Sequence, residues 1–122
     1  MIGRHKVAGI TISAEPEPMD ISRENTSLIV VDMQNGFVGT NLNIILKTSQ
    51  IRYLLFIGVA TNVCVGSTVR DAYHRGYFPI VVSDATASFG PEYTHDTEIW
   101  NFKFIFGWVT TTDDLIKSLH GK

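Results

Sequence analysis

The apolar residues of this 122-residue chain fall into short unbroken runs separated by stretches with helical spacing. Continuous β-branched runs are typical of strands buried on both faces of a parallel sheet. The first run ends in an acid, Asp32. Strands are therefore predicted at residues 27–32, 52–59 and 78–83.

Helical spacing appears between and after these strands. Val65, Val69 and Ala72 recur at intervals of four and three residues, and Gly76 follows where a C-cap glycine belongs. The threonines at 110–112 resemble an N-cap cluster. Helices are predicted at residues 41–50, 62–75, 92–101 and 113–120, and a last strand at residues 102–109.

Helices interleaved with buried parallel strands define an α/β three-layer sandwich of the Rossmann-like kind, whose ligand crevices lie at the carboxyl ends of the strands. Residues 27–122 fit one such domain. Residues 1–26 are expected to form an N-terminal arm, because Pro16 and Pro18 remove backbone donors and favour extended structure.

Composition excludes several classes of protein. A hydrophobic content of 44% predicts a packed core, and a net charge of -2 without a basic stripe argues against nucleic acid as a partner. No apolar run approaches the roughly 20 residues that cross a bilayer, so no membrane span and a cytoplasmic location are expected. One cysteine and four isolated histidines indicate no metal or other cofactor. A dinucleotide-binding fold is disfavoured because no G-x-G-x-x-G follows the first strand.

Cys64 is a candidate nucleophile. It lies just after the predicted strand at 52–59, in the first turn of the next helix, where free backbone N–H groups and the helix dipole favour a thiolate. The alternative is that Cys64 packs as a small buried hydrophobe.

Asp32 and Asp84 each end a predicted strand. For Asp32 a general base and a capping or turn acceptor are equally supported by position alone. For Asp84 capping is favoured, because the sequence that follows it is typical of a turn.

Two segments resemble the isochorismatase-like family of cysteine hydrolases. Leu-Ile-Val-Val-Asp-Met-Gln-Asn at 28–35 is similar to its first strand with the catalytic aspartate, and Gly-Val-Ala-Thr-Asn-Val-Cys-Val at 58–65 is similar to its nucleophile turn. Residues 52–86 and 106–109 resemble the ureidoacrylate amidohydrolase branch in particular, which acts in pyrimidine breakdown.

The resemblance implies a Cys, Asp, Lys triad acting on a small-molecule amide without a cofactor. Cys64 would attack the carbonyl, and Asp32 would take the thiol proton and later help to activate water. The Val59–Ala60 peptide would be cis, so that the N–H groups of Ala60 and Cys64 form an oxyanion hole.

The chain departs from the family near Val38 and Gly39. There the first strand is joined directly to a Gly-Thr-Asn-Leu helix that comes much later in the family, and the block between them, which holds the lysine, is missing. Neither Lys6 nor Lys47 occupies a matching position. The family's sheet order 3-2-1-4-5-6 would shorten to four strands, 1-4-5-6.

Two consequences are expected. Catalysis would be impaired without the lysine, and the first strand would become an apolar sheet edge that favours homo-oligomers or lowers stability. The alternative function is a non-catalytic interaction protein that pairs through this edge.

Overall fold

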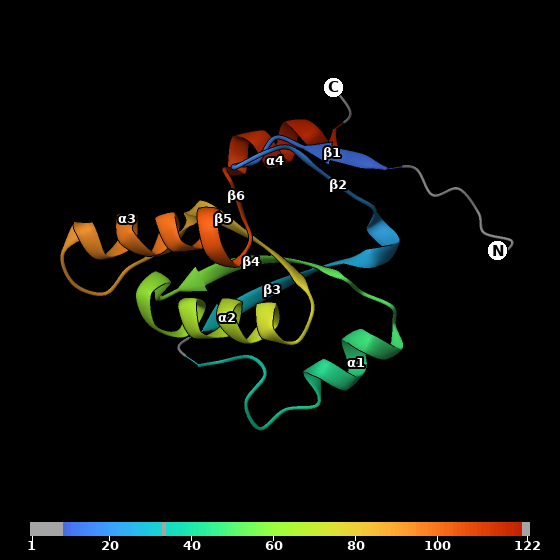
Figure 1. Ribbon diagram of the computed structural model, residues 1–122, viewed down its shortest axis with the longest axis horizontal. Helices are drawn as coiled ribbons and strands as arrows, with labels where there is room; N and C mark the ends of the chain where they lie inside the picture. The colour runs from blue at the N-terminus through green and yellow to red at the C-terminus, as the bar shows by residue number, and fades with distance from the viewer. Residues whose placement is uncertain (1–8, 33, 121–122) are drawn as a thin grey trace, which may run out of the picture.

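The computed structural model describes residues 9–32 and 34–120, and its centre is a four-stranded parallel sheet (Figure 1). The predicted α/β class and the order 1-4-5-6 are confirmed, because the strands lie side by side in chain order. The strands are β3 (Thr26–Asp32), β4 (Tyr53–Val59), β5 (Phe78–Ala87) and β6 (Trp108–Thr110).

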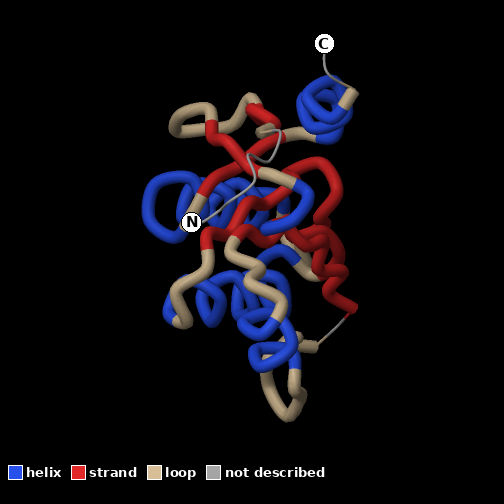
Figure 2. Tube along the Cα trace, turned by 90° about the vertical axis from the view of Figure 1, so that its right-hand side faces the viewer, coloured by secondary structure: helices blue, strands red, loops and turns tan. Residues whose placement is uncertain are grey.

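Two different layers cover the sheet. One face packs against three helices, and the other packs against α4 (Thr112–Leu119) and an N-terminal hairpin. Figure 2 shows the strands between the C-terminal helix and the other helices. The first layer consists of α1 (Leu42–Thr48), α2 (Gly66–His74) and α3 (Glu92–Asn101), with two π-helical turns, η2 (Thr61–Val65) and η3 (Phe102–Phe106).

The N-terminal hairpin is a feature that the sequence analysis did not foresee. β1 (Ile10–Ile12) and β2 (Met19–Ile21) pair antiparallel, and a short 3₁₀ turn, η1 (Arg23–Asn25), leads into β3. Its apolar side chains pack with Ile80 and Val82 in the hydrophobic core on the α4 side of the sheet. The hairpin loop also pairs with β6, because Glu15 and Val109 exchange backbone hydrogen bonds of 2.8 and 2.9 Å.

β3 forms one edge of the sheet, as predicted from the missing block. Its side chains alternate, with Ile29 and Val31 in the core and Leu28 and Val30 exposed. The expectation of a strand buried on both faces is therefore wrong. The hairpin and α4 cover the second face over β4 to β6, which leaves the outward residues of β3 uncovered in the described part of the chain.

The predicted strand at residues 102–109 is half wrong. Phe102 to Phe106 form the π-helical turn η3, and only Trp108–Thr110 enter the sheet. The reason lies in the burial of the aromatic run, since Phe102 and Phe106 pack into the core while Phe104 and Ile105 are exposed. That spacing belongs to a helix and not to a strand.

Asp84 lies inside β5, which continues to Ala87, so the predicted strand end is wrong. Its capping role is present all the same: the Asp84 carboxylate accepts from the backbone N–H of Thr112 at 2.8 Å and from the Thr112 hydroxyl at 2.9 Å, at the start of α4. The backbone bond and then the hydroxyl bond hold the pKa of Asp84 below its usual value.

Candidate active site

Asp32 lies at the carboxyl end of β3, directly beside the end of β4. The strands are parallel, and Asp32 is the register partner of Val59. The Asp32 side chain is exposed. This exposure follows from the edge position of β3, because among the described residues only β4 pairs with it. The carboxylate thus occupies the expected end of the sheet but is open to solvent.

Cys64 follows the end of β4 through a turn that begins with a cis Val59–Ala60 peptide. The Ala60 carbonyl accepts from the N–H groups of Val63 and Val65, both at 3.0 Å, and this starts the π-helical turn that continues into α2. Cys64 is half-buried and packs against the hydrophobic core on the face of the sheet that α1, α2 and α3 cover. The predicted strand-to-helix turn is therefore present, with a π-helical first turn.

A buried threonine links the Cys64 turn to the loop after β3. The Thr68 hydroxyl donates to the Cys64 carbonyl at 2.7 Å and accepts from the Gly36 N–H at 3.3 Å. The Asn35 side chain donates to Asp71 on the same helix at 2.9 Å. Thr68 is fully buried. These bonds hold the loop that follows Asp32 against α2, the helix that continues from the Cys64 turn.

A second set of polar contacts fixes the turn from the side of α3. Thr61 is fully buried, and its hydroxyl lies 3.0 Å from Nδ1 of His95. The Asn62 side chain bonds both backbone groups of Phe89, accepting at 2.9 Å and donating at 2.8 Å. The two residues between Ala60 and Val63 therefore hold the turn in place through their side chains.

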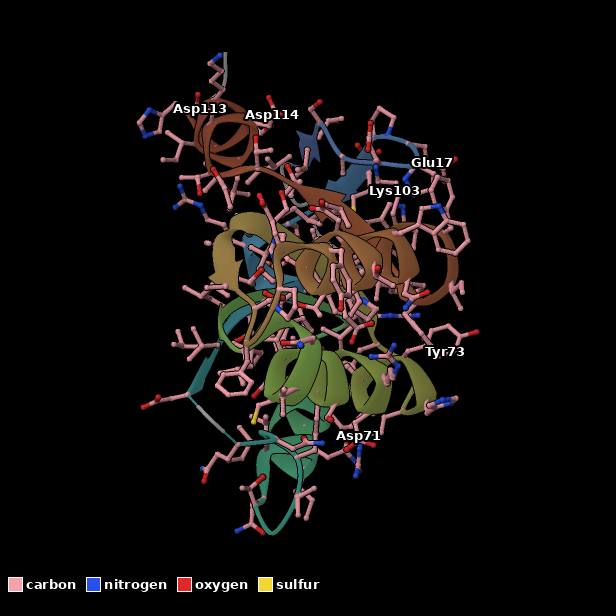
Figure 3. The ribbon with its side chains drawn as sticks, turned by 90° about the vertical axis from the view of Figure 1, so that its left-hand side faces the viewer. Glu17, Asp71, Tyr73, Lys103, Asp113 and Asp114 are labelled. Carbon is pink, nitrogen blue, oxygen red and sulfur yellow. The ribbon has the colours of Figure 1, made fainter. Side chains whose placement is uncertain are left out.

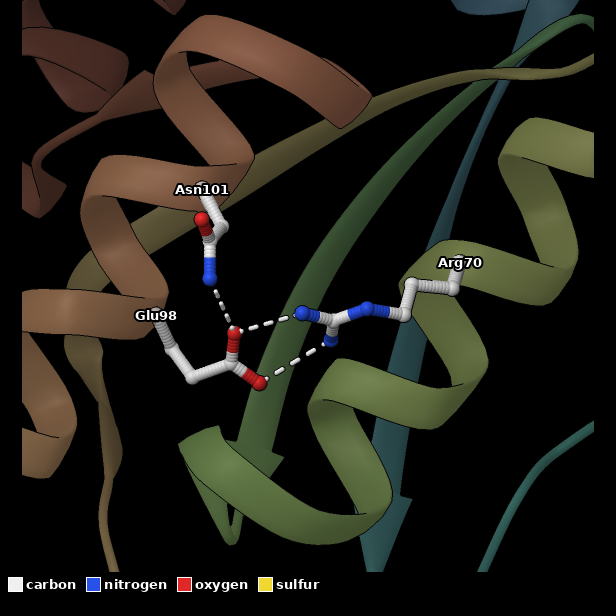
Figure 4. Close-up of polar contacts among 3 residues, drawn as sticks. All are labelled: Arg70, Glu98 and Asn101. Carbon is white, nitrogen blue, oxygen red and sulfur yellow. Dashed lines mark hydrogen bonds and ion pairs between the residues drawn. The ribbon is translucent and has the colours of Figure 1, made fainter.

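An ion pair joins α2 to α3 beside this turn (Figure 4). Arg70 donates to the two oxygens of Glu98 at 2.8 and 2.9 Å, and Asn101 donates to Glu98 at 3.0 Å. Burial raises the pKa of Glu98, but the bonds from Arg70 and Asn101 outweigh it, and the net pKa is lowered. Gly66 makes room for the pair, since a Cβ there would lie 2.5 Å from Glu98 Oε2.

No lysine of the described residues lies at this turn. Lys47 donates to the Arg75 carbonyl at 2.8 Å, at the opposite end of α2 from Cys64. Lys103 pairs with Glu15, and Figure 3 shows Lys103 near Glu17, away from Asp71 on α2. Lys117 is on α4, across the sheet, and Lys6 lies outside the described residues.

The described part of the chain contains no helix long and apolar enough to cross a membrane. Nor do residues 9–32 and 34–120 gather three side chains that could hold a metal ion.

Sequence comparisons identify relatives of this chain. Residues 35–114 match the family model described as the Isochorismatase domain. The ureidoacrylate amidohydrolase RutB of Agrobacterium fabrum is 40% identical over 100 residues, which are 82% of this chain and 41% of that protein. RutB of Azorhizobium caulinodans is 42% identical over 99 residues, 81% of this chain and 41% of that protein. The chain spans about two fifths of the length of the curated relatives that it matches.

Two solved structures with a similar fold carry related names. An isochorismatase-like hydrolase from Alkaliphilus metalliredigens is 40% identical with a TM-score of 0.63, over 68% of this chain and 45% of that one. A cysteine hydrolase from Pseudomonas syringae pv. phaseolicola is 29% identical with a TM-score of 0.65, over 70% and 45% of the two chains. Fold and site together define a parallel α/β protein with a cysteine at a strand-to-helix turn. The chain belongs to the isochorismatase family of hydrolases.

The structure places the backbones of Asp32, Ala60 and Cys64 at the carboxyl ends of two paired strands, and their roles in catalysis stay a prediction. The family match includes Ala60 and Cys64 and begins after Asp32. Sequence reasoning missed the residues that hold the site together, Asn35, Thr68 and Asp71. The intervals Cys64 to Thr68 and Thr68 to Asp71 are those of neighbours on a helix surface, and that spacing was the available signal.

Proposed function

We propose that this chain is an amidohydrolase-type member of the family that uses Cys64 as its nucleophile on a small amide such as ureidoacrylate, a compound of pyrimidine breakdown, and that its turnover is impaired. The observation that supports the proposal is the register pairing of Asp32 with Val59, because it brings the backbone of Asp32 beside the peptide that opens the Cys64 turn. The names of the relatives supply the substrate class.

The proposed chemistry has two steps. Asp32 accepts the Cys64 proton, and the thiolate attacks the amide carbonyl while the N–H groups of Ala60 and Cys64 bind the developing oxyanion. The C–N bond breaks, the amine leaves with a proton, and a thioester on Cys64 remains. Water then attacks the thioester, which releases the acid and restores the thiol.

We expect impairment because none of the lysines in residues 9–32 and 34–120 lies at the Cys64 turn. Lys47 and Lys103 are bonded elsewhere and Lys117 lies on α4 across the sheet. The Asp32 carboxylate is exposed, and solvent weakens the interaction of an exposed charge with other groups. Losing one member of a group that works as a unit commonly removes most of the rate even when the nucleophile remains. A thioester that forms slowly and is hydrolysed more slowly is the expected result.

Intact-mass spectrometry tests the assignment of Cys64. The chain is incubated with ureidoacrylate, quenched in acid and compared with Cys64→Ala treated in the same way. We expect a mass increase of one acyl group on the unsubstituted chain and none on Cys64→Ala. An adduct that forms equally on both proteins would overturn the role of Cys64.

A second candidate is a non-catalytic interaction protein. The exposed apolar residues on edge strand β3 favour it, because such edges pair with other chains. A thiol that labels no faster in the folded chain than in the denatured chain would favour this candidate over hydrolysis.

A further inference from the structure

The outer edge of β3 lacks the features that usually prevent pairing with another strand. Within residues 9–32 and 34–120 only β4 pairs with β3, so the backbone groups on its other side have no strand partner. Soluble proteins usually block such an edge with lysine, proline or a bulge. β3 has none of these, because its register with β4 is unbroken from Thr26 to Asp32 and its sequence is TSLIVVD.

The exposed side chains of this edge are apolar and neighbouring. Leu28 and Val30 point to the same face and are 54% and 63% exposed. A polar residue stands at each end of the strand, Thr26 at its start and Asp32 at its end. The surface is therefore an apolar centre with a hydroxyl at one end and a carboxylate at the other.

We propose that a second copy of this chain occupies this edge, with the two β3 strands antiparallel about a two-fold axis that is perpendicular to the sheet and passes between Ile29 and Ile29 of the partner subunit. A two-fold interface brings the same patch against itself. In this register Leu28 lies opposite Val30 of the partner subunit, and Thr26 lies opposite Asp32 of the partner subunit. Apolar side chains then pair with apolar ones, and a hydroxyl can donate to a carboxylate.

Shifting the axis by one residue in either direction puts unfavourable side chains opposite each other. With the axis at Val30, Leu28 would face Asp32 of the partner subunit, which sets an apolar side chain against a charge. With the axis at Leu28, Asp32 would face Glu24 of the partner subunit, and two carboxylates would oppose each other. The sequence of the strand thus selects Ile29 as the centre. The two sheets would join into one sheet of eight strands.

Light scattering on a concentration series tests the assembly. The chain should approach about twice its monomer mass as concentration rises. Val30→Lys places a charge in the centre of the edge and should weaken the dimer at least about tenfold. Val38→Lys is the matched control, because Val38 is 67% exposed but lies in the loop after β3, and it should dimerise like the unsubstituted chain.

Disulfide trapping tests the register even if Val30→Lys fails to fold. In a Cys64→Ala background, Leu28→Cys and Val30→Cys chains of different mass should cross-link mainly to each other when mixed. Mainly like-with-like cross-links, a monomer at every concentration, or equal dimers for Val30→Lys and Val38→Lys would each overturn the proposal. A monomer with slowly exchanging β3 amides would show in addition that another segment of the same chain covers the edge.

Discussion

Asp32 and Val59 are register partners at the ends of the parallel strands β3 and β4. Val59 begins the cis peptide that leads into the Cys64 turn, so this one pairing fixes the end of the first strand beside the start of that turn. The Asp32–Val59 register is a property of the backbone, and the Asp32 side chain itself is exposed.

Cys64 should be more reactive in the folded chain than in the unfolded chain. Its backbone lies in the first turn of a helix, where unpaired N–H groups and the positive end of the dipole stabilise a thiolate. Iodoacetamide labelling at neutral pH, followed by mass in buffer and in urea, measures the ratio of rates. Because Cys64 is the single cysteine, no other thiol competes. Slower labelling of the folded chain would contradict an activated nucleophile.

Thr68→Val should lower the free energy of unfolding by about 1 to 2 kcal/mol, because it removes a buried hydroxyl that bonds both Cys64 and Gly36. Urea denaturation measures the change. Thr97→Val, at an exposed position of α3, is the control, and its effect should be within about 0.5 kcal/mol. Equal effects of the two substitutions would mean that the Thr68 link does not fix the site.

The sequence located the end of β4, the cysteine turn, the Gly76 C-cap and the N-cap of α4, where Thr111 accepts from Asp114 at 3.2 Å. These features are local, so neighbouring residues determine them. The hairpin and the half-exposed face of β3 depend on contacts between segments far apart in the chain. The apolar content of a strand does not predict which of its two faces another layer of the protein will cover.

The ion pair between Arg70 and Glu98 should stabilise the fold by about 1 kcal/mol at neutral pH, a value kept small because the Arg70 side chain is partly solvated. The folded pKa of Glu98 is lowered from the ordinary 4.5, so this contribution is present above that pH and is lost as pH falls through the lower folded pKa. Glu98→Gln should therefore be less stable than the unsubstituted chain at neutral pH, and the difference should shrink in acid.

Thermal unfolding across that pH range checks the Glu98 prediction. Glu92→Gln is the control on the same helix, since Glu92 is exposed and makes no ion pair among the described residues. Gly66→Ala should resemble Glu98→Gln, because the added methyl group displaces the pair. A difference for Glu98→Gln that does not change between neutral and acid pH would rule out the charged pair as its cause.

Product release from ureidoacrylate by the unsubstituted chain and by Cys64→Ala is the most direct test of the whole account. The amine that leaves when the C–N bond breaks is measured against time at a known protein concentration, because the acyl part stays on Cys64 until water hydrolyses the thioester. The account predicts release that slows after about one equivalent per chain, as a thioester on Cys64 accumulates, and no such release from Cys64→Ala. Sustained turnover that Cys64→Ala abolishes would show that another group replaces the lysine, and equal release from both proteins would contradict Cys64 as the nucleophile.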